Sequence, residues 1–233
     1  MKALYDMSRS DNVEIGFIFD WDGVVVDSSA QHEESWERLA AQEGLPLFEG
    51  HFKLGFGKRN QLIIPDILKW SNDPSEIERL GKQKEVHYRD IIQETGIDPL
   101  PGVRNFVESL IKEGFPFAVG SSTPRENIEA VMSGAGIEGL FHEIVAAADV
   151  SRGKPDPEVF LKAAGLIKVP PNRCVVFEDS VSGVEAGLAG GMKVIGLTTT
   201  NNRDMMKQCG ASLVKDSFEE ISFEEILAIV DSK

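Results

Sequence analysis

One short segment organises this chain: Phe17-Ile18-Phe19-Asp20-Trp21-Asp22-Gly23. Its apolar half, which begins at Ile15, predicts a buried strand, because it is too short for a helix and is bounded by polar residues. Side chains two apart on an extended segment point the same way, so Asp20 and Asp22 are expected to face one point while Trp21 faces another. Gly23 allows the backbone to turn sharply just after them.

Two carboxylates this close repel each other unless a cation lies between them or one of them carries a proton, and either arrangement suits catalysis. The alternative is that each aspartate is only a turn residue or a helix cap, which is the usual role of a single aspartate at a strand end. The pairing of Asp20 with Asp22 favours a chemical role.

The chain is acidic and of moderate length. Its 233 residues carry a formal net charge of −14, and the length allows one α/β domain with a smaller insert. Because phosphate backbones and anionic lipids attract basic surfaces, we expect neither nucleic acid nor membrane as a partner. Cys174 and Cys209 form no metal-binding pattern, and the polar N-terminus lacks a signal sequence, so we expect a cytoplasmic protein. We also expect a monomer.

Residues 29–99 show helical periodicity and no convincing strand. A first helix is expected to start at a capping box of Ser28 and Gln31 and to end at Gly44, and a later one to open at Asp73-Pro74. The segment Pro99-Leu100-Pro101-Gly102 then returns the chain to the core. We therefore predict a catalytic core at 1–28 and 100–233, with a helical cap domain at 29–99 hinged on two linkers.

From Gly102 onward, helical and strand patterns alternate, which predicts βαβ units in a parallel sheet with helices on both faces. A predicted strand at 115–119 ends in Gly120-Ser121-Ser122-Thr123, where hydroxyls and free N–H groups suit a phosphate. The alternative is that these hydroxyls only cap the next helix. The spacing does not separate Ser121 from Ser122 or Thr123.

Two further segments carry charged groups. Gly153-Lys154-Pro155-Asp156-Pro157 holds an ammonium on a stiff backbone before a helix, where it would counter the charge of a phosphoryl group. The apolar run 174–177 ends in Glu178 and Asp179, whose oxygens are ligands that Mg²⁺ prefers. Ligands of open parallel sheets bind beyond the carboxyl ends of the strands, so we expect all these segments to meet in one crevice.

The four segments, their order and the helical insertion resemble the haloacid dehalogenase-like superfamily, in particular its beta-phosphoglucomutase-like phosphatases and mutases, from about Ile15 to Val214. The resemblance implies a Rossmann-like core with a helical cap. It also implies that Asp20 attacks phosphorus and that Asp22 is the general acid and base, a role for which we expect a raised pKa. By the same resemblance Ser121 and Lys154 are catalytic, and Mg²⁺ is held by Asp20, Asp22, Glu178 and Asp179, with Glu178 acting directly or through water.

The expected substrate-binding residues are His32, Lys58, Arg59 and Ser122. Relatives offer a cation to the distal part of the substrate from a cap loop, here Gly55-Phe56-Gly57-Lys58-Arg59-Asn60, although a solvated turn would look the same. His32 is otherwise a packed residue of the cap. We expect Lys84 to be an exposed helical lysine and a weaker candidate.

These features predict a Mg²⁺-dependent phosphatase that hydrolyses a small phosphorylated metabolite, such as a sugar phosphate, through an aspartyl-phosphate. A beta-phosphoglucomutase-type hexose phosphate mutase is the alternative, because cap closure decides whether water or a sugar hydroxyl accepts the phosphoryl group. A catalytically inactive metal- or phosphate-binding protein is a third hypothesis, and the completeness of the motifs disfavours it. The presence of Asp22 argues against dehalogenation.

Overall fold

A six-stranded parallel sheet forms the centre of the structure, a computed structural model that describes residues 15–55 and 58–232. This confirms the predicted α/β class. The strand order is β3-β2-β1-β4-β5-β6, so the strand that precedes Asp20 lies in the middle. The strands are β1 (Gly16–Phe19), β2 (Phe117–Gly120), β3 (Ile144–Val145), β4 (Cys174–Glu178), β5 (Lys193–Leu197) and β6 (Leu213–Lys215).

The register of the sheet brings its carboxyl ends level with one another. Phe19 of β1 lies opposite Val119 of β2 and Phe177 of β4. The residues that follow these three strands therefore leave the sheet at the same edge. This is the geometry that the sequence predicted for the catalytic segments.

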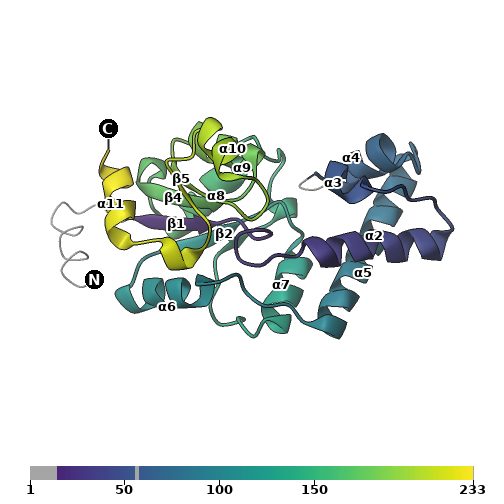
Figure 1. Ribbon diagram of the computed structural model, residues 1–233, viewed down its shortest axis with the longest axis horizontal. Coiled ribbons are helices and arrows are strands. Elements are labelled where there is room, and N and C mark those ends of the chain that lie inside the picture. The colour runs from purple at the N-terminus through teal and green to yellow at the C-terminus, as the bar shows by residue number, and fades with distance from the viewer. Residues whose placement is uncertain (1–14, 56–57, 233) are drawn as a thin grey trace.

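Helices cover both faces of the sheet (Figure 1). Phe17, Phe19 and Phe177 pack on one face against α6, α7 and α11. The other face packs against α8, α9 and α10. These helices are α6 (Val103–Glu113), α7 (Arg125–Gly134), α8 (Glu158–Ile167), α9 (Val181–Ala189), α10 (Arg203–Gln208) and α11 (Phe223–Asp231), with short 3₁₀ turns at Ala147–Asp149, Pro171–Arg173 and Phe218–Glu220.

The helices between β1 and α6 form a separate lobe (Figure 1). This lobe has a small apolar core of its own, built on Trp36, Leu39 and Ile64. No strand occurs in the described part of residues 29–98, and the two linkers meet where Val26 and Pro99 form an antiparallel bridge. The elements are α2 (Ser29–Glu43), α3 (His51–Gly55), α4 (Asn60–Leu62), a π-helical segment (Ile63–Leu68) and α5 (Pro74–Thr95).

The ends of the inserted helices agree with the sequence in all but one case. Gly44 ends α2 in a left-handed conformation (φ 65°), and Asp73 caps α5 by accepting a hydrogen bond from the Glu76 N–H at 2.9 Å. The predicted capping box at Ser28 is wrong. Its hydroxyl makes no cap hydrogen bond and instead donates to Asp22 Oδ1 at 2.5 Å, because the turn after β1 places that carboxylate beside it.

The secondary structure contains no candidate for a membrane span: within the described residues no helix combines the necessary length with an apolar sequence. The polar segment Met1 to Val13, on which the expected absence of a signal sequence rests, lies outside the described residues.

Candidate active site

Three buried carboxylates gather at the carboxyl edge of the sheet. Asp20 follows β1, Glu178 ends β4 and Asp179 comes next, and an oxygen of each lies within 4.8 Å of the other two. Lys154, from the loop before α8, reaches the same place, with its Nζ 2.9 Å from Asp20 Oδ1 and 2.6 Å from Glu178 Oε1. Four residues that the sequence singled out are thus neighbours, and three negative charges face one positive charge.

The Lys154 ammonium is held in a buried position, 4.7 Å from the centre of the Phe160 ring on α8. Burial alone would lower the pKa of Lys154, but the charges of Asp20 and Glu178 raise it above its usual range. The lysine therefore stays protonated and supplies a fixed positive charge beside Asp20.

Glu178 is fixed by the start of α9. Its Oε2 accepts hydrogen bonds from the Asp179 N–H, the Ser180 N–H and the Ser180 hydroxyl, each at 2.9 Å. Glycine is required beside it, because a Cβ at Gly183 would lie 1.7 Å from Glu178 Oε1. Gly23 has the same function for Asp179: its φ is 78°, and a Cβ there would lie 1.8 Å from Asp179 Oδ2.

Two residues of this site were missed by the sequence analysis, which assigned no chemistry to the chain after Val194. The Thr200 hydroxyl donates to Asp179 Oδ2, and Asn201 Nδ2 donates to the Asp179 carbonyl at 2.9 Å. Both follow β5, in the run Thr198-Thr199-Thr200-Asn201. A run of hydroxyls after a strand is the signal that identified Ser121, and it would have found Thr200 too.

The three carboxylates have the donor atoms and the charge that suit a divalent cation. Burial raises the pKa of Asp20 to about 7; the charge of Lys154 opposes this and Glu178 adds to it. Burial also raises the pKa of Asp179 well above its usual range, with contributions from Glu178 and Asp20. Asp20 Oδ1, although paired with Lys154, accepts no hydrogen bond of good geometry. Excess buried negative charge and an unsatisfied oxygen are properties that a bound cation would relieve.

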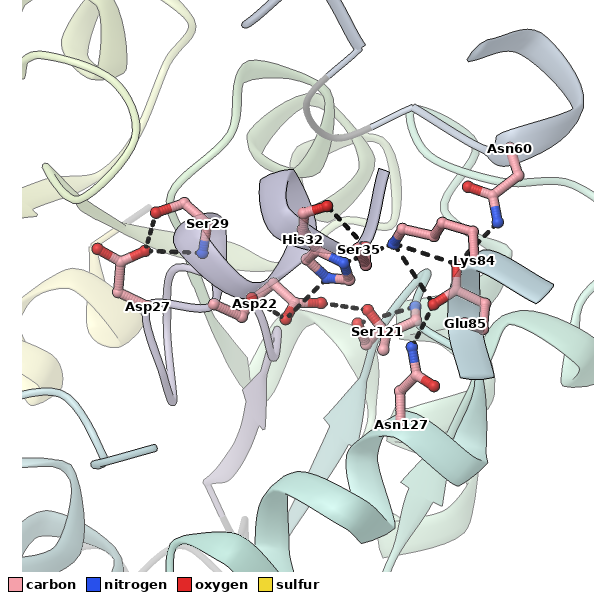
Figure 2. Close-up of polar contacts among 12 residues, drawn as sticks. Asp22, Asp27, Ser29, His32, Ser35, Asn60, Lys84, Glu85, Ser121 and Asn127 are labelled. Atoms are coloured by element: carbon pink, nitrogen blue, oxygen red, sulfur yellow. Dashed lines mark hydrogen bonds and ion pairs between the residues drawn. The ribbon is translucent and has the colours of Figure 1, made fainter. Parts of the chain in front are cut away.

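Asp22 faces a different set of groups, and its carboxylate lies outside this cluster of three. It accepts hydrogen bonds from the hydroxyls of Ser28 and Thr123. His32 faces it, with Nε2 3.7 Å from Asp22 Oδ1 (Figure 2). The expected rise in the pKa of Asp22 is wrong. Burial would raise that pKa, but His32 and the two hydroxyls lower it to about 2, because the neighbours of Asp22 are donors and not carboxylates.

The three hydroxyls after β2 have separate environments. Ser121 is buried, with its N–H donating to the Val145 carbonyl at 2.9 Å and its Oγ accepting from the Thr123 N–H at 3.2 Å. Thr123 contacts Asp22. Ser122 is partly exposed, and its side chain has no hydrogen bond to the described residues.

The inserted helices bring His32 over this site. Its ring stacks on Tyr88, with centroids 4.1 Å apart, and its Nδ1 lies 2.6 Å from Lys84 Nζ. Lys84 is 3% exposed, so the expectation of an exposed lysine is wrong. It lies on the face of α5 that packs against α2, and burial lowers its pKa, with Glu85 opposing.

The two cations of the cap loop differ in position. The Arg59 guanidinium lies against the backbone of Gly153, the residue before Lys154, since a Cβ at Gly153 would be 2.7 Å from Arg59 Nη2. Lys58 is exposed and has no side-chain partner among the described residues. Phe56 and Gly57 of the same loop lie outside the described residues.

Comparison with known proteins places this geometry in context. The sequence profile of the haloacid dehalogenase-like hydrolases matches residues 16–191. The chain is 34% identical to 5-amino-6-(5-phospho-D-ribitylamino)uracil phosphatase of Arabidopsis thaliana, over 94% of this chain but only 58% of that protein's length. It is 31% identical to hexitol phosphatase A of Escherichia coli, over 89% of this chain and 93% of that protein. The crystal structure of beta-phosphoglucomutase from Clostridium difficile covers 94% of this chain and 98% of its own, with 27% identity and a TM-score of 0.80.

Proposed function

This chain belongs to the haloacid dehalogenase-like hydrolase family, and on that premise we propose that it is a Mg²⁺-dependent phosphatase of a small phosphorylated sugar or polyol. One observation carries the proposal. Asp20, Glu178 and Asp179 share a buried point with the ammonium of Lys154, while Asp22 is held nearby by donors of its own. This arrangement separates a nucleophile from a proton-transfer group.

In the proposed reaction, an oxygen of Asp20 attacks phosphorus and the bond from phosphorus to the sugar oxygen breaks, which gives an aspartyl-phosphate. Asp22, whose low pKa keeps it ionised before the substrate binds, must first take up a proton, and His32 is the nearest group for that exchange. Asp22 then gives this proton to the leaving oxygen and takes one from the water that attacks phosphorus. The bond to Asp20 breaks in this second step, and inorganic phosphate leaves. Lys154 neutralises charge on the phosphoryl oxygens in both steps, and Ser121 donates a hydrogen bond to one of them.

Mg²⁺, when bound, would supply further neutralisation of charge, and Asp20, Glu178 and Asp179 are the side chains that would hold it. His32 is placed to orient Asp22 and to exchange a proton with it, since its Nε2 lies 3.7 Å from that carboxylate. These roles are supported by the position of the three carboxylates at the carboxyl edge of the sheet and by that of His32 on α2 beside Asp22.

Residues 29–99 act in this proposal as a cap domain on the core formed by 1–28 and 100–233. Support comes from the separate apolar core of the inserted helices and from the bridge that joins the two linkers. Arg59 is the cap cation assigned to the distal part of the substrate, because it reaches the loop that carries Lys154, whereas Lys58 is exposed. Ser122 is assigned as a further contact.

The proposed substrate class follows from the relatives. One is named for a phosphorylated ribityl compound and another for a hexitol. The purified chain should be tested for phosphate release from hexitol and hexose phosphates, nucleotides, phosphoglycolate and an aryl phosphate, with Mg²⁺ and with EDTA. We expect turnover of a sugar or polyol phosphate that EDTA and Asp20→Asn both abolish. Turnover that survives Asp20→Asn, or none across the panel, would overturn the proposal.

A hexose phosphate mutase is the second candidate. It is favoured by the contact of His32 with Lys84 between the cap helices α2 and α5 and by the likeness to the Clostridium difficile mutase. The two activities are separated by following phosphate release and isomer formation from beta-glucose 1-phosphate with a bisphosphate primer. Isomer formation that is faster than phosphate release would replace the phosphatase assignment.

A further inference from the structure

Glu85 links the inserted helices to the core through a single amide. It lies on α5, and its Oε2 accepts a hydrogen bond at 2.5 Å from Nδ2 of Asn127 on α7 (Figure 2). Arg89, one turn further along α5, donates from Nη1 to Oδ1 of the same amide at 2.9 Å. Asn127 is fully buried, and residues of α5 contact both the oxygen and the nitrogen of its amide.

The other oxygen of Glu85 organises the cap itself. Glu85 Oε1 accepts a hydrogen bond from Asn60 Nδ2 at 2.7 Å and lies 3.3 Å from Lys84 Nζ. Burial would raise the pKa of Glu85, but Lys84, His32, Asn60 and Asn127 together lower it, so the carboxylate keeps its charge. The residue next to Lys84 is therefore tied on one side to the cap and on the other to the core.

Among the described residues, few side-chain hydrogen bonds join the inserted helices to the core. Within residues 15–55 and 58–232, Glu85 and Arg89 make the only side-chain hydrogen bonds from the inserted helices to the core, apart from those of the linker. His32 approaches Asp22 only to 3.7 Å, and Arg59 meets Gly153 by packing alone. Tyr88 and Ile92 also pack α5 into the apolar cluster of the core, and the amide of Asn127 adds a polar tie between α5 and α7.

We propose that Glu85 is a positioning residue, which latches α5 to α7 through Asn127 and thereby holds Lys84 and His32 at Asp22. The effect on catalysis rests on the proposed phosphatase function, whereas the latch itself does not. Removing the latch leaves every group that touches the substrate in the chain but lets the cap helix move away from the core. Because a buried acceptor or donor is then left without its partner, the loss should be well above that of a surface hydrogen bond.

Exchanging the hydrogen-bond donor and acceptor between positions 85 and 127 tests the latch. Glu85→Gln leaves one acceptor oxygen for the amide donors of Asn60 and Asn127, so one of the two loses its partner. Asn127→Asp places a second carboxylate against Glu85. In the double variant the introduced glutamine amide can donate to the introduced aspartate, which still accepts from Arg89. We expect kcat/KM for the best substrate of the panel to fall about tenfold or more in each single variant and to recover to within about threefold of the wild type in the double variant. The double variant lacks the carboxylate that Glu85 places beside Lys84. If its kcat/KM recovers, the loss in the single variants comes from the broken hydrogen bond between α5 and α7 and not from the missing charge.

A distance measurement tests the latch without any turnover. Nitroxide labels are attached at Lys82→Cys and Glu129→Cys, two exposed positions on α5 and α7, and Cys209→Ser removes a partly exposed native thiol. Pulsed electron paramagnetic resonance should then give a single narrow distribution of label-to-label distances. Each single variant should broaden that distribution and the double variant should narrow it again. Glu94→Gln removes an exposed carboxylate from the same helix, where it pairs with Arg38, and should change neither readout.

Single variants that match the wild type in the distance distribution, or a double variant that stays as broad and as impaired as the single ones, would overturn the proposal. If the wild type hydrolyses no phosphate ester, the distance distributions still decide whether the latch exists. Failure of the latch and failure of the proposed function are thus told apart.

Discussion

A single added methyl group at Gly183 should disable the site while leaving the fold intact. The Cβ of Gly183→Ala would lie 1.7 Å from Glu178 Oε1 and 1.8 Å from its Cδ, where real Cβ contacts are essentially never under 3.0 Å. The carboxylate must therefore retreat by at least 1.3 Å, the difference between 3.0 Å and 1.7 Å. Its contacts with Lys154 at 2.6 Å and with the start of α9 cannot all survive that shift.

The cost to stability is small. Overpacking a buried site costs ~1–3 kcal/mol, and alanine in place of glycine inside a helix returns up to ~1 kcal/mol. The free energy of unfolding should therefore fall by only ~0–3 kcal/mol, the difference between these effects. The cost to activity is larger, because misplacing a group near the reacting atoms by about 1 Å can reduce the rate ~100-fold.

The assay is phosphate release as a function of substrate and Mg²⁺ concentration, with urea unfolding as the measure of stability. Gly165→Ala is the matched control, since an added Cβ in α8 meets nothing within 4 Å. It should gain ~0.5–1 kcal/mol and keep full activity. Wild-type kcat/KM and Mg²⁺ dependence in Gly183→Ala would refute the view that the position of Glu178 controls the site.

Three more predictions concern the cation, its outer contacts and the cap. Because burial raises the pKa of Asp20 to about 7, the folded protein in EDTA holds a proton that the unfolded chain has lost, so stability should fall from pH 4 toward pH 7. Mg²⁺ replaces that proton, and its effect on the melting temperature should be larger at pH 8 than at pH 5; an equal effect would contradict a metal at Asp20. Thr200→Val should raise the Mg²⁺ concentration for half-maximal activity about 10-fold or more, whereas Thr199→Val, in the same run, should not; equal behaviour of the two would exclude the Thr200 contact as the cause. Arg59→Ala should raise KM for a hexitol phosphate about tenfold, by loss of a charged contact, and the exposed Lys58→Ala should leave it unchanged; the reverse result would assign the cap cation to Lys58.

The core of the site was predictable because it is built on strand ends. A buried strand has a strong local pattern, and the carboxyl ends of parallel strands meet at one edge whatever the connections between them. Asp20, Glu178 and Lys154 were therefore expected together, and they lie together. The side-chain roles proposed for them await the experiments above.

The helical part was less predictable, because the burial of a helical residue depends on which helices surround it. Lys84 lies on α5, which packs against α2 on one side and α7 on the other, so it is buried although helical lysines are usually exposed. The low pKa of Asp22 has a similar cause. Ser28 is six residues away and Thr123 a hundred and one, and only the folded chain brings both hydroxyls to one carboxylate.

The bridge between Val26 and Pro99 has a consequence for how such proteins diversify. Opposed residues of an antiparallel bridge have Cα atoms about 5 Å apart, a gap that a tight turn can close. The chain therefore enters and leaves the helical lobe at neighbouring points, although α5 also packs against α7 of the core. The insertion can be shortened, lengthened or replaced without any change in the order of the strands. Substrate specificity can therefore change while the residues at the strand ends, and their chemistry, stay the same.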